Sequence, residues 1–145
     1  MLTWRGARER RTANGPSGYL FRMDLPMTAR IAGVSRVAIG AALLAAPRLV
    51  GKPWLGEVSE RPATQMAIAG LGASDMVIGA GTVWALAGRN RDVGPWLIAA
   101  GLADAADFLG AFRFRKDLSS ESVAFTAGLA GGSALLHAWL QSELG

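Results

Sequence analysis

The sequence predicts an all-α membrane protein, a four-helix transmembrane bundle in which consecutive helices are antiparallel neighbours. Two observations support this fold class. The chain has 145 residues, of which 51% are hydrophobic and 19 are glycines, a composition that suits one domain and is too apolar for a disordered chain. Four apolar stretches also have about the 20 residues that a helix needs to cross a hydrocarbon core. They cover residues 30–50, 65–88, 93–112 and 122–141.

A soluble four-helix bundle is the alternative fold. Each helix of such a bundle has a polar face that recurs with a period near 3.6 residues. The second stretch instead has only Gln65, Ser74, Asp75 and Thr82 as polar side chains. We therefore favour membrane spans, although buried helices rich in alanine and glycine resemble them.

Residues 1–27 are expected to form a basic, disordered arm. Arginines surround the turn-forming residues 14–16 (Asn-Gly-Pro), and the segment has no helical periodicity. A solvated tail that influences membrane topology is the simplest interpretation, and a patch attracted to anionic lipid is the alternative. Nucleic acid is not an expected partner, because the arm lacks aromatic residues at base-stacking spacing. Met23 and Met27 offer alternative translation starts directly before the first span.

The connections between the spans are short or interrupted by proline. Pro47, Pro53 and Pro62 prevent a continuous helix across the longest connection, and Ser119 or Ser120 is expected to cap the last helix. Short connections make consecutive helices antiparallel. Lysine and arginine favour cytoplasmic termini when the arm is counted, and the preference reverses without it. We predict a multi-pass protein of the cell membrane with both termini in the cytoplasm.

Away from their ends, the first three apolar stretches contain four ionisable residues. They are Arg36, Asp75, Asp104 and Asp107. A carboxylate at the centre of a span costs roughly 2.5–3.5 kcal/mol on an insertion scale. Counted along the helices, the four residues fall within roughly one to one and a half turns of one depth. We therefore expect an intramembrane polar cluster near the midplane that faces the bundle interior.

The partners within this cluster are predicted from depth. We expect Arg36 to reach Asp75 or Asp107. Asp107 should matter more than Asp104 for folding or activity, because Asp104 lies nearer the surface, where water reaches it. Three acids against one arginine leave an excess of negative charge, which protonation, water, a cation or a partner group would balance. The cluster either sets helix register or forms a small polar pocket or proton site.

Glycine gives a second pattern. Gly128 and Gly132 form a GxxxG motif, and Gly70 and Gly79 belong to the glycine-rich second span. Small residues let helices approach closely in lipid. We predict that these glycines pack helices together within the bundle, with contact between copies in a homo-oligomer as the alternative.

Several kinds of chemistry are absent from the sequence. The chain has no cysteine and one histidine, His137, so it has no disulfide, no thiol nucleophile and too few ligands for a histidine-built metal centre. We expect His137 to be an interfacial or packed residue. A Gly-x-Ser-x-Gly nucleophile motif is also absent. Acid and base work by the three aspartates is the only visible enzymatic chemistry, so we expect neither an enzyme nor a bound cofactor or metal.

Three segments resemble a loosely defined group of small four-helix bacterial membrane proteins that are DoxX-like in appearance and common in actinobacteria. The segments are "SRVAIGAALLAAP", "GASDMVIGAG" and "GLADAADFLGAF", and the resemblance covers about residues 28–140. Such proteins often have an Arg-Asp or Arg-Glu pair in the second span, where this chain has Ser74 and Asp75. The resemblance implies the architecture and a bacterial inner membrane, and it implies no activity.

Two functions remain open. The first is a structural or accessory role in the lipid bilayer, as a homo-oligomer or with a membrane-protein partner. The second is a small transporter or proton-linked carrier that uses the buried aspartates. A continuous water-accessible cavity that reaches the aspartates favours transport, and a dry, fully paired cluster favours the structural role.

Overall fold

The computed structural model describes residues 24–88 and 91–145. Most of the predicted basic arm therefore lies outside the described residues. The first helix, α1, spans Leu25–Ala45 and so includes the last three residues that we assigned to the arm. It begins there because the Asp24 carboxylate accepts a hydrogen bond of 3.2 Å from the backbone N–H of Met27 and a proline occupies its first turn.

The described part of the chain is helical and contains no strand. The other long helices are α3 (Pro62–Ala87), α4 (Gly94–Arg113) and α5 (Ser120–Leu144), and the shorter elements are α2 (Pro47–Leu55) and the 3-10 helix η1 (Gly56–Glu60). All four long helices have the length and hydropathy of a membrane span, which confirms the all-α fold class and indicates a multi-pass membrane protein.

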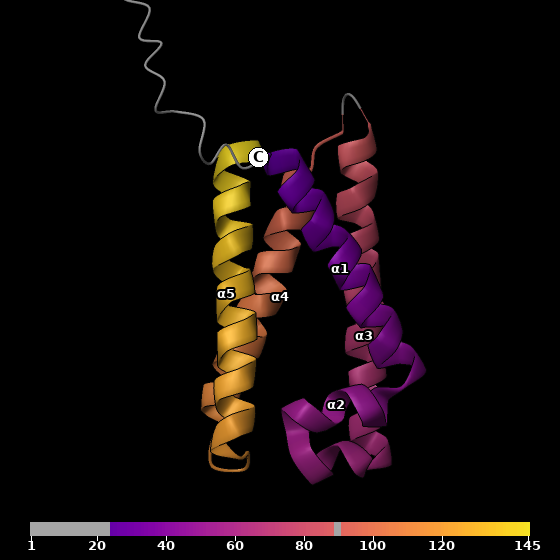
Figure 1. Cartoon of the computed structure of the whole chain (residues 1–145), viewed down its shortest axis with the longest axis vertical. Helices are drawn as coiled ribbons and strands as arrows, with labels where there is room; N and C mark the ends of the chain where they lie inside the picture. Colours follow the sequence, from indigo (N-terminus) through magenta and orange to yellow (C-terminus); the bar gives the residue numbers. More distant parts are fainter. Residues whose placement is uncertain (1–23, 89–90) are drawn as a thin grey trace, which may run out of the picture.

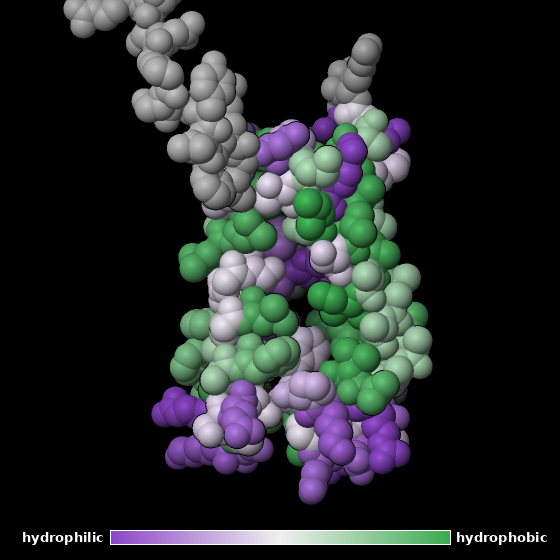
Figure 2. Space-filling model, viewed as in Figure 1, coloured by the Kyte–Doolittle hydropathy of each residue, from purple (hydrophilic) through white to green (hydrophobic). Residues whose placement is uncertain are grey.

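The surface of these helices is apolar where lipid would surround it. Met66, Leu102 and Leu135 are 76%, 67% and 75% exposed. In Figure 2 hydrophobic residues (green) occupy the middle of the visible face, and hydrophilic residues (purple) gather below them. A soluble protein rarely exposes so continuous an apolar surface, whereas a membrane protein requires one.

The long helices form two pairs (Figure 1). α1 packs along α3, and α4 packs along α5, whereas α3 and α4 touch each other far less. At the end of the bundle that holds Leu25 and Leu144, an apolar cluster joins the pairs. The buried members of this apolar cluster are Ala29, Ala85, Val93, Leu97 and Leu140.

At the opposite end, α2 contacts both α3 and α5. This helix was not predicted. Pro47 and Pro62 lie at the starts of α2 and α3 and so separate helices as expected, whereas Pro53 lies inside α2 and does not break it. Pro47 lies at the start of α2, where its missing N–H costs nothing, and the chain leaves α2 at Gly56 with φ of 60°, a conformation that favours glycine. α2 therefore closes one end of the space between the two helical pairs.

Close backbone contact joins α1 to α3. A Cβ atom added to Gly40 would lie 2.4 Å from the carbonyl oxygen of Gly72, and one added to Gly79 would lie 2.4 Å from that of Gly33. The packing role predicted for Gly79 is thus confirmed, and Gly72, another glycine of the glycine-rich second span, shares it, whereas Gly33 and Gly40 of the first span were missed. Only glycine allows two helix backbones to approach this closely.

The packing role within the bundle is wrong for the other three predicted glycines. No atom lies within 4 Å of a Cβ built on Gly70, Gly128 or Gly132, and all three residues are exposed. A GxxxG spacing identifies one helix face without saying whether that face turns toward a neighbour or toward lipid. Ser119 does cap α5 as expected, because its hydroxyl accepts a hydrogen bond of 3.1 Å from the backbone N–H of Ser122.

Candidate functional site

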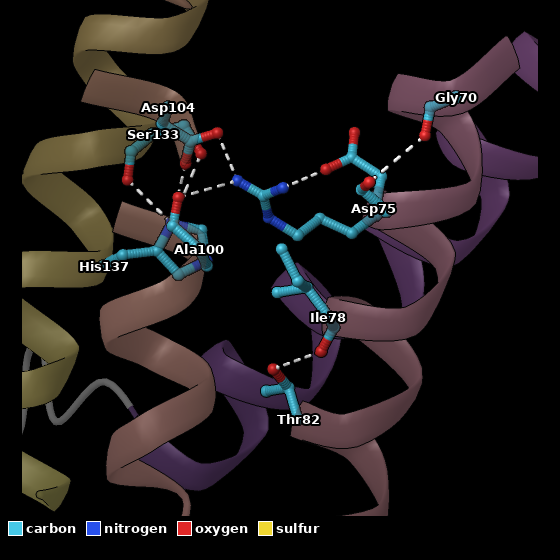
Figure 3. Close-up of polar contacts among 10 residues, drawn as sticks. Gly70, Asp75, Ile78, Thr82, Ala100, Asp104, Ser133 and His137 are labelled. Atoms are coloured by element: carbon cyan, nitrogen blue, oxygen red, sulfur yellow. Dashed lines mark hydrogen bonds and ion pairs between the residues drawn. The ribbon is translucent and has the colours of Figure 1, made fainter. Parts of the chain in front are cut away.

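Arg36 joins the two helical pairs. One terminal nitrogen, Nη1, donates to Asp75 on α3, and the other, Nη2, donates to Asp104 on α4. Nη2 also donates to the carbonyl oxygen of Ala100 at 3.1 Å (Figure 3). The arginine is only 8% exposed, and buried charge is tolerated in an apolar interior when it is paired and hydrogen-bonded. We call Arg36, Asp75 and Asp104 the ionic cluster.

His137 brings α5 to the ionic cluster. Its Nδ1 atom lies 2.8 Å from the backbone carbonyl oxygen of Ser133 and 3.1 Å from Oδ2 of Asp104 (Figure 3). A carbonyl oxygen can only accept a hydrogen bond, so Nδ1 carries a hydrogen and donates it to Ser133. Oδ2 of Asp104 is close enough for an ion-pair contact but has no hydrogen bond among the described residues. His137 is 3% exposed, which confirms a packed position.

Asp107 has a different environment from the other two aspartates. It lies on α4, one turn beyond Asp104, and it has no hydrogen bond or ion pair within residues 24–88 and 91–145. Its side chain lines a cavity of about 90 Å³ together with Arg36, Asp75 and Asp104. We call this space the central cavity. The structure thus brings all four predicted polar residues to one place.

A second cavity adjoins the central cavity on the side of α2. This α2-side cavity has a volume of about 350 Å³, and both spaces are lined by Trp54, Asp107 and Thr126. Figure 2 shows the surface hollowed between the two helical pairs, with hydrophilic atoms inside the hollow. The central cavity has room for a few water molecules. Asp107 lines both spaces, whereas Asp75 and Asp104 line the central cavity and not the larger one.

Two buried donors near the central cavity lack a hydrogen bond. The indole N–H of Trp54 and Nε of Arg36 have no acceptor among the described residues, and both side chains line the central cavity. A buried donor left without an acceptor costs about 1–3 kcal/mol. An oxygen atom bound in the central cavity, from water or a ligand, is the group that would satisfy them.

The prediction that Arg36 reaches Asp75 or Asp107 is confirmed at Asp75, whereas the order of importance predicted for Asp107 and Asp104 does not fit the contacts. Arg36 contacts Asp104 rather than Asp107, and Asp104 is buried rather than open to water. The reason is position along α4. Ala100 and Asp104 are four residues apart and meet Arg36 together, whereas Asp107 lies on nearly the same face, about 20° around the axis from Ala100, but one turn farther along the helix than Asp104. Depth counted from the sequence did not distinguish these two turns.

Sequence reasoning missed three contributors to the site. Ser133 and His137 lie four residues apart on one face of α5, and such polar spacing in an apolar helix is a signal that was available. Trp54 carries no comparable signal, because its position depends on α2, a helix that the sequence did not predict. Among residues 24–88 and 91–145, no group of three or more His, Asp or Glu side chains is placed to hold a metal ion.

Comparisons with protein-family models, with curated proteins and with solved structures found no match to this chain. The resemblance to DoxX-like proteins therefore stays a prediction.

Proposed function

We propose that this protein is a small proton-linked membrane carrier in which Asp107 exchanges a proton within the central cavity. One observation carries the proposal. Asp107 is the only aspartate of the four-residue group that Arg36 does not hold, and it borders both cavities. A carboxylate without a partner in an apolar interior is costly, and such residues commonly mark ion or proton pathways.

The charges around Asp107 support this assignment. Arg36 faces the central cavity from α1, Asp75 from α3 and Asp104 from α4. Polar groups without formal charge come from α2 and α5, and they are Trp54, Thr126 and Ser133. One guanidinium against three carboxylates leaves net negative charge, even though the His137 ring lies close to Asp104. Taking up a proton or another cation reduces this charge and its desolvation cost.

The arrangement of the helices also suits a carrier. The central cavity lies between two helical pairs, near the middle of α1, α3 and α4. Carriers commonly hold their cargo near the bilayer midplane between two halves that rock against each other. Because α3 and α4 touch little, the Arg36 contact with Asp104 is a principal link between the two halves at this depth.

The structural or accessory role remains the second candidate. It is favoured by the pairing of Arg36 with two carboxylates and a carbonyl, which fixes the register of α1 against α3 and α4. This role accounts for Arg36, Asp75 and Asp104. It gives no reason for Asp107 to line both cavities.

Infrared spectroscopy on the purified protein in lipid nanodiscs tests the proposal. We expect a pH titration to change the carboxyl C=O band, and we expect the Asp107→Asn variant to lose that change. Asp117→Asn is the matched control, because Asp117 is exposed and lines neither cavity. A titration that is the same in wild type and in Asp107→Asn would overturn the assignment of Asp107 as the exchanging group.

We also propose that the chain lies in the cell membrane with both termini in the cytoplasm. An even number of long helices supports termini on one side, and Leu25 and Leu144 pack against the same apolar cluster. The choice of side depends on the arginines of the arm. Reporter fusions at the two ends of the chain test this orientation. Activity of a reporter that works only outside the cytoplasm would contradict it.

A further inference from the structure

The α2-side cavity has the size and lining of a binding site for a small ligand. Ligand sites usually have volumes of about 300–1,000 Å³ and mostly apolar walls, and this space has about 350 Å³. Helices α2, α3, α4 and α5 all contribute to it. Its apolar lining residues are Trp54, Leu55, Ala67, Ile68, Leu71, Ala106, Gly110, Ala111, Phe114 and Leu118.

The charge of this cavity comes from one carboxyl group. Within residues 24–88 and 91–145, Asp107 is the only ionisable residue that lines it, and the other polar groups are the hydroxyls of Thr64 and Thr126 and the indole of Trp54. No lysine or arginine among the described residues lines the space. The guanidinium of Arg36 lies in the adjoining central cavity, where Asp75 and Asp104 hold it. A ligand that enters the α2-side cavity therefore meets one carboxylate that makes no ion pair with a cation of the described residues.

An aromatic residue adds to the preference for a cation. Trp54 lines the same space as Asp107, and the face of an aromatic ring attracts an ammonium group. Phe114 supplies apolar wall to the space, because the guanidinium of Arg113 already lies 5.8 Å from the centroid of its ring. An anion would face Asp107 without a compensating donor. A strongly hydrated inorganic ion would exchange its water shell for mostly apolar walls, which is unfavourable.

We infer that the α2-side cavity binds an apolar organic cation, an ammonium group on a compact hydrocarbon or aromatic body, with the ammonium at Asp107 and the body between Trp54 and Phe114. The inference rests on the proposed function, because the same carboxylate exchanges the proton. When the cation binds, the protonated Asp107 carboxyl releases its proton to water, and the carboxylate that forms pairs with the ammonium. Cation and proton therefore compete for one site.

Calorimetric titration of the full chain in nanodiscs tests this substrate class with three probes. Benzyltrimethylammonium carries a permanent positive charge, neopentylbenzene is its uncharged carbon isostere, and benzenesulfonate is an anion on a similar body. Empty nanodiscs correct for partitioning into lipid. We expect the ammonium probe to bind more tightly than either of the others, and we expect proton release, seen as a dependence of the binding heat on the buffer.

Substitutions then separate charge from shape. Asp107→Asn should weaken binding of the ammonium probe by at least about tenfold and leave the isostere unchanged, whereas Asp117→Asn should change neither. Trp54→Leu should weaken ammonium binding about threefold or more. Trp84→Leu is its control, because Trp84 is 56% exposed and lines neither cavity.

The outcomes distinguish this inference from the proposed function. If the isostere binds as tightly as the ammonium probe, or if Asp107→Asn keeps the affinity, the substrate class is wrong, while the infrared titration of Asp107 still decides the proton-exchange proposal. A different result would separate the two the other way. If Asp107→Asn abolishes binding of the ammonium probe, but the wild type releases no proton on binding and its carboxyl C=O band does not change with pH, the cation site is correct and the proton-linked function is wrong.

Discussion

Arg36 on α1 donates to Asp104 on α4 across the boundary between the two helical pairs. Most other contacts are made within a pair, between α1 and α3 or between α4 and α5. The same guanidinium holds Asp75 on α3. At this depth a single buried side chain therefore joins the two halves of the protein, and it pairs with two of the three carboxylates there.

The first prediction concerns that link. Arg36→Leu should reduce the free energy of unfolding by about 3–5 kcal/mol, because it leaves two carboxylates without their cation in an apolar interior. Unfolding by denaturing detergent in mixed micelles measures the loss. Arg48→Gln is the control, since the contact of Arg48 with Glu60, at 3.0 Å, is exposed and such pairs contribute at most about 1 kcal/mol. Equal effects of the two substitutions would contradict the role of Arg36.

The second prediction separates the two aspartates of α4. Asp104→Asn should destabilise the protein by about 3 kcal/mol or more, because it removes a charge that Arg36 contacts. Asp107→Asn should leave stability unchanged or raise it, since Asp107 has no ion pair to lose among the described residues. The same unfolding measurement gives both values. A greater loss of stability in Asp107→Asn than in Asp104→Asn would contradict this prediction and agree with the order of importance predicted from the sequence.

The spans could be predicted because the bilayer sets their length and composition. The errors lie at their ends. The first span was expected over residues 30–50, but α1 ends at Ala45, because the position before Pro47 disfavours the helical conformation. Its start at Leu25 depends on the Asp24 cap, which the apolar pattern does not contain.

The four buried ionisable residues could be predicted to lie together, but the pairs that they form could not be predicted. The cost of burying Arg36, Asp75, Asp104 and Asp107 singly was sufficient to place them together. Which aspartate Arg36 reaches depends on how the helices cross and on their relative depth to within one turn, and the sequence states neither. Trp54 could not be assigned at all, because α2 brings it to the cavities from a connection in which no helix was predicted.

A third prediction concerns the close contact of α1 with α3. Gly40→Ala should destabilise the protein by about 1–3 kcal/mol, because the new Cβ would lie 2.4 Å from the carbonyl oxygen of Gly72. Gly128→Ala should stay within about 1 kcal/mol of wild type, since it has open space around it. Detergent unfolding of both variants checks this contrast, and a neutral Gly40→Ala would show that the helices are not in contact here.

A fourth prediction addresses the exposed glycines of α5. If Gly128 and Gly132 face a second copy of the chain, substituting both by leucine should convert an oligomer into a monomer while the unfolding of each copy changes little. Mass measurement in nanodiscs or mild detergent decides it. An unchanged assembly state after this double substitution would exclude the GxxxG face as an interface between copies.

Water access to the border of the two cavities tests the central claim most directly. The chain has no cysteine, so single-cysteine variants react at one chosen position with a charged, membrane-impermeant thiosulfonate. Thr126 lines both cavities, whereas Leu97 is 1% exposed within the apolar cluster. Lys116→Cys, exposed in the turn between α4 and α5, marks the membrane side on which α2 lies.

The account predicts that Thr126→Cys reacts in proteoliposomes when the reagent is on the side marked by Lys116→Cys, and that Leu97→Cys stays unreactive from either side. If Thr126→Cys were as unreactive as Leu97→Cys, the space beside Asp107 would be dry. The protein would then be held together by its ionic cluster without a route from water to Asp107, which would contradict the carrier proposal.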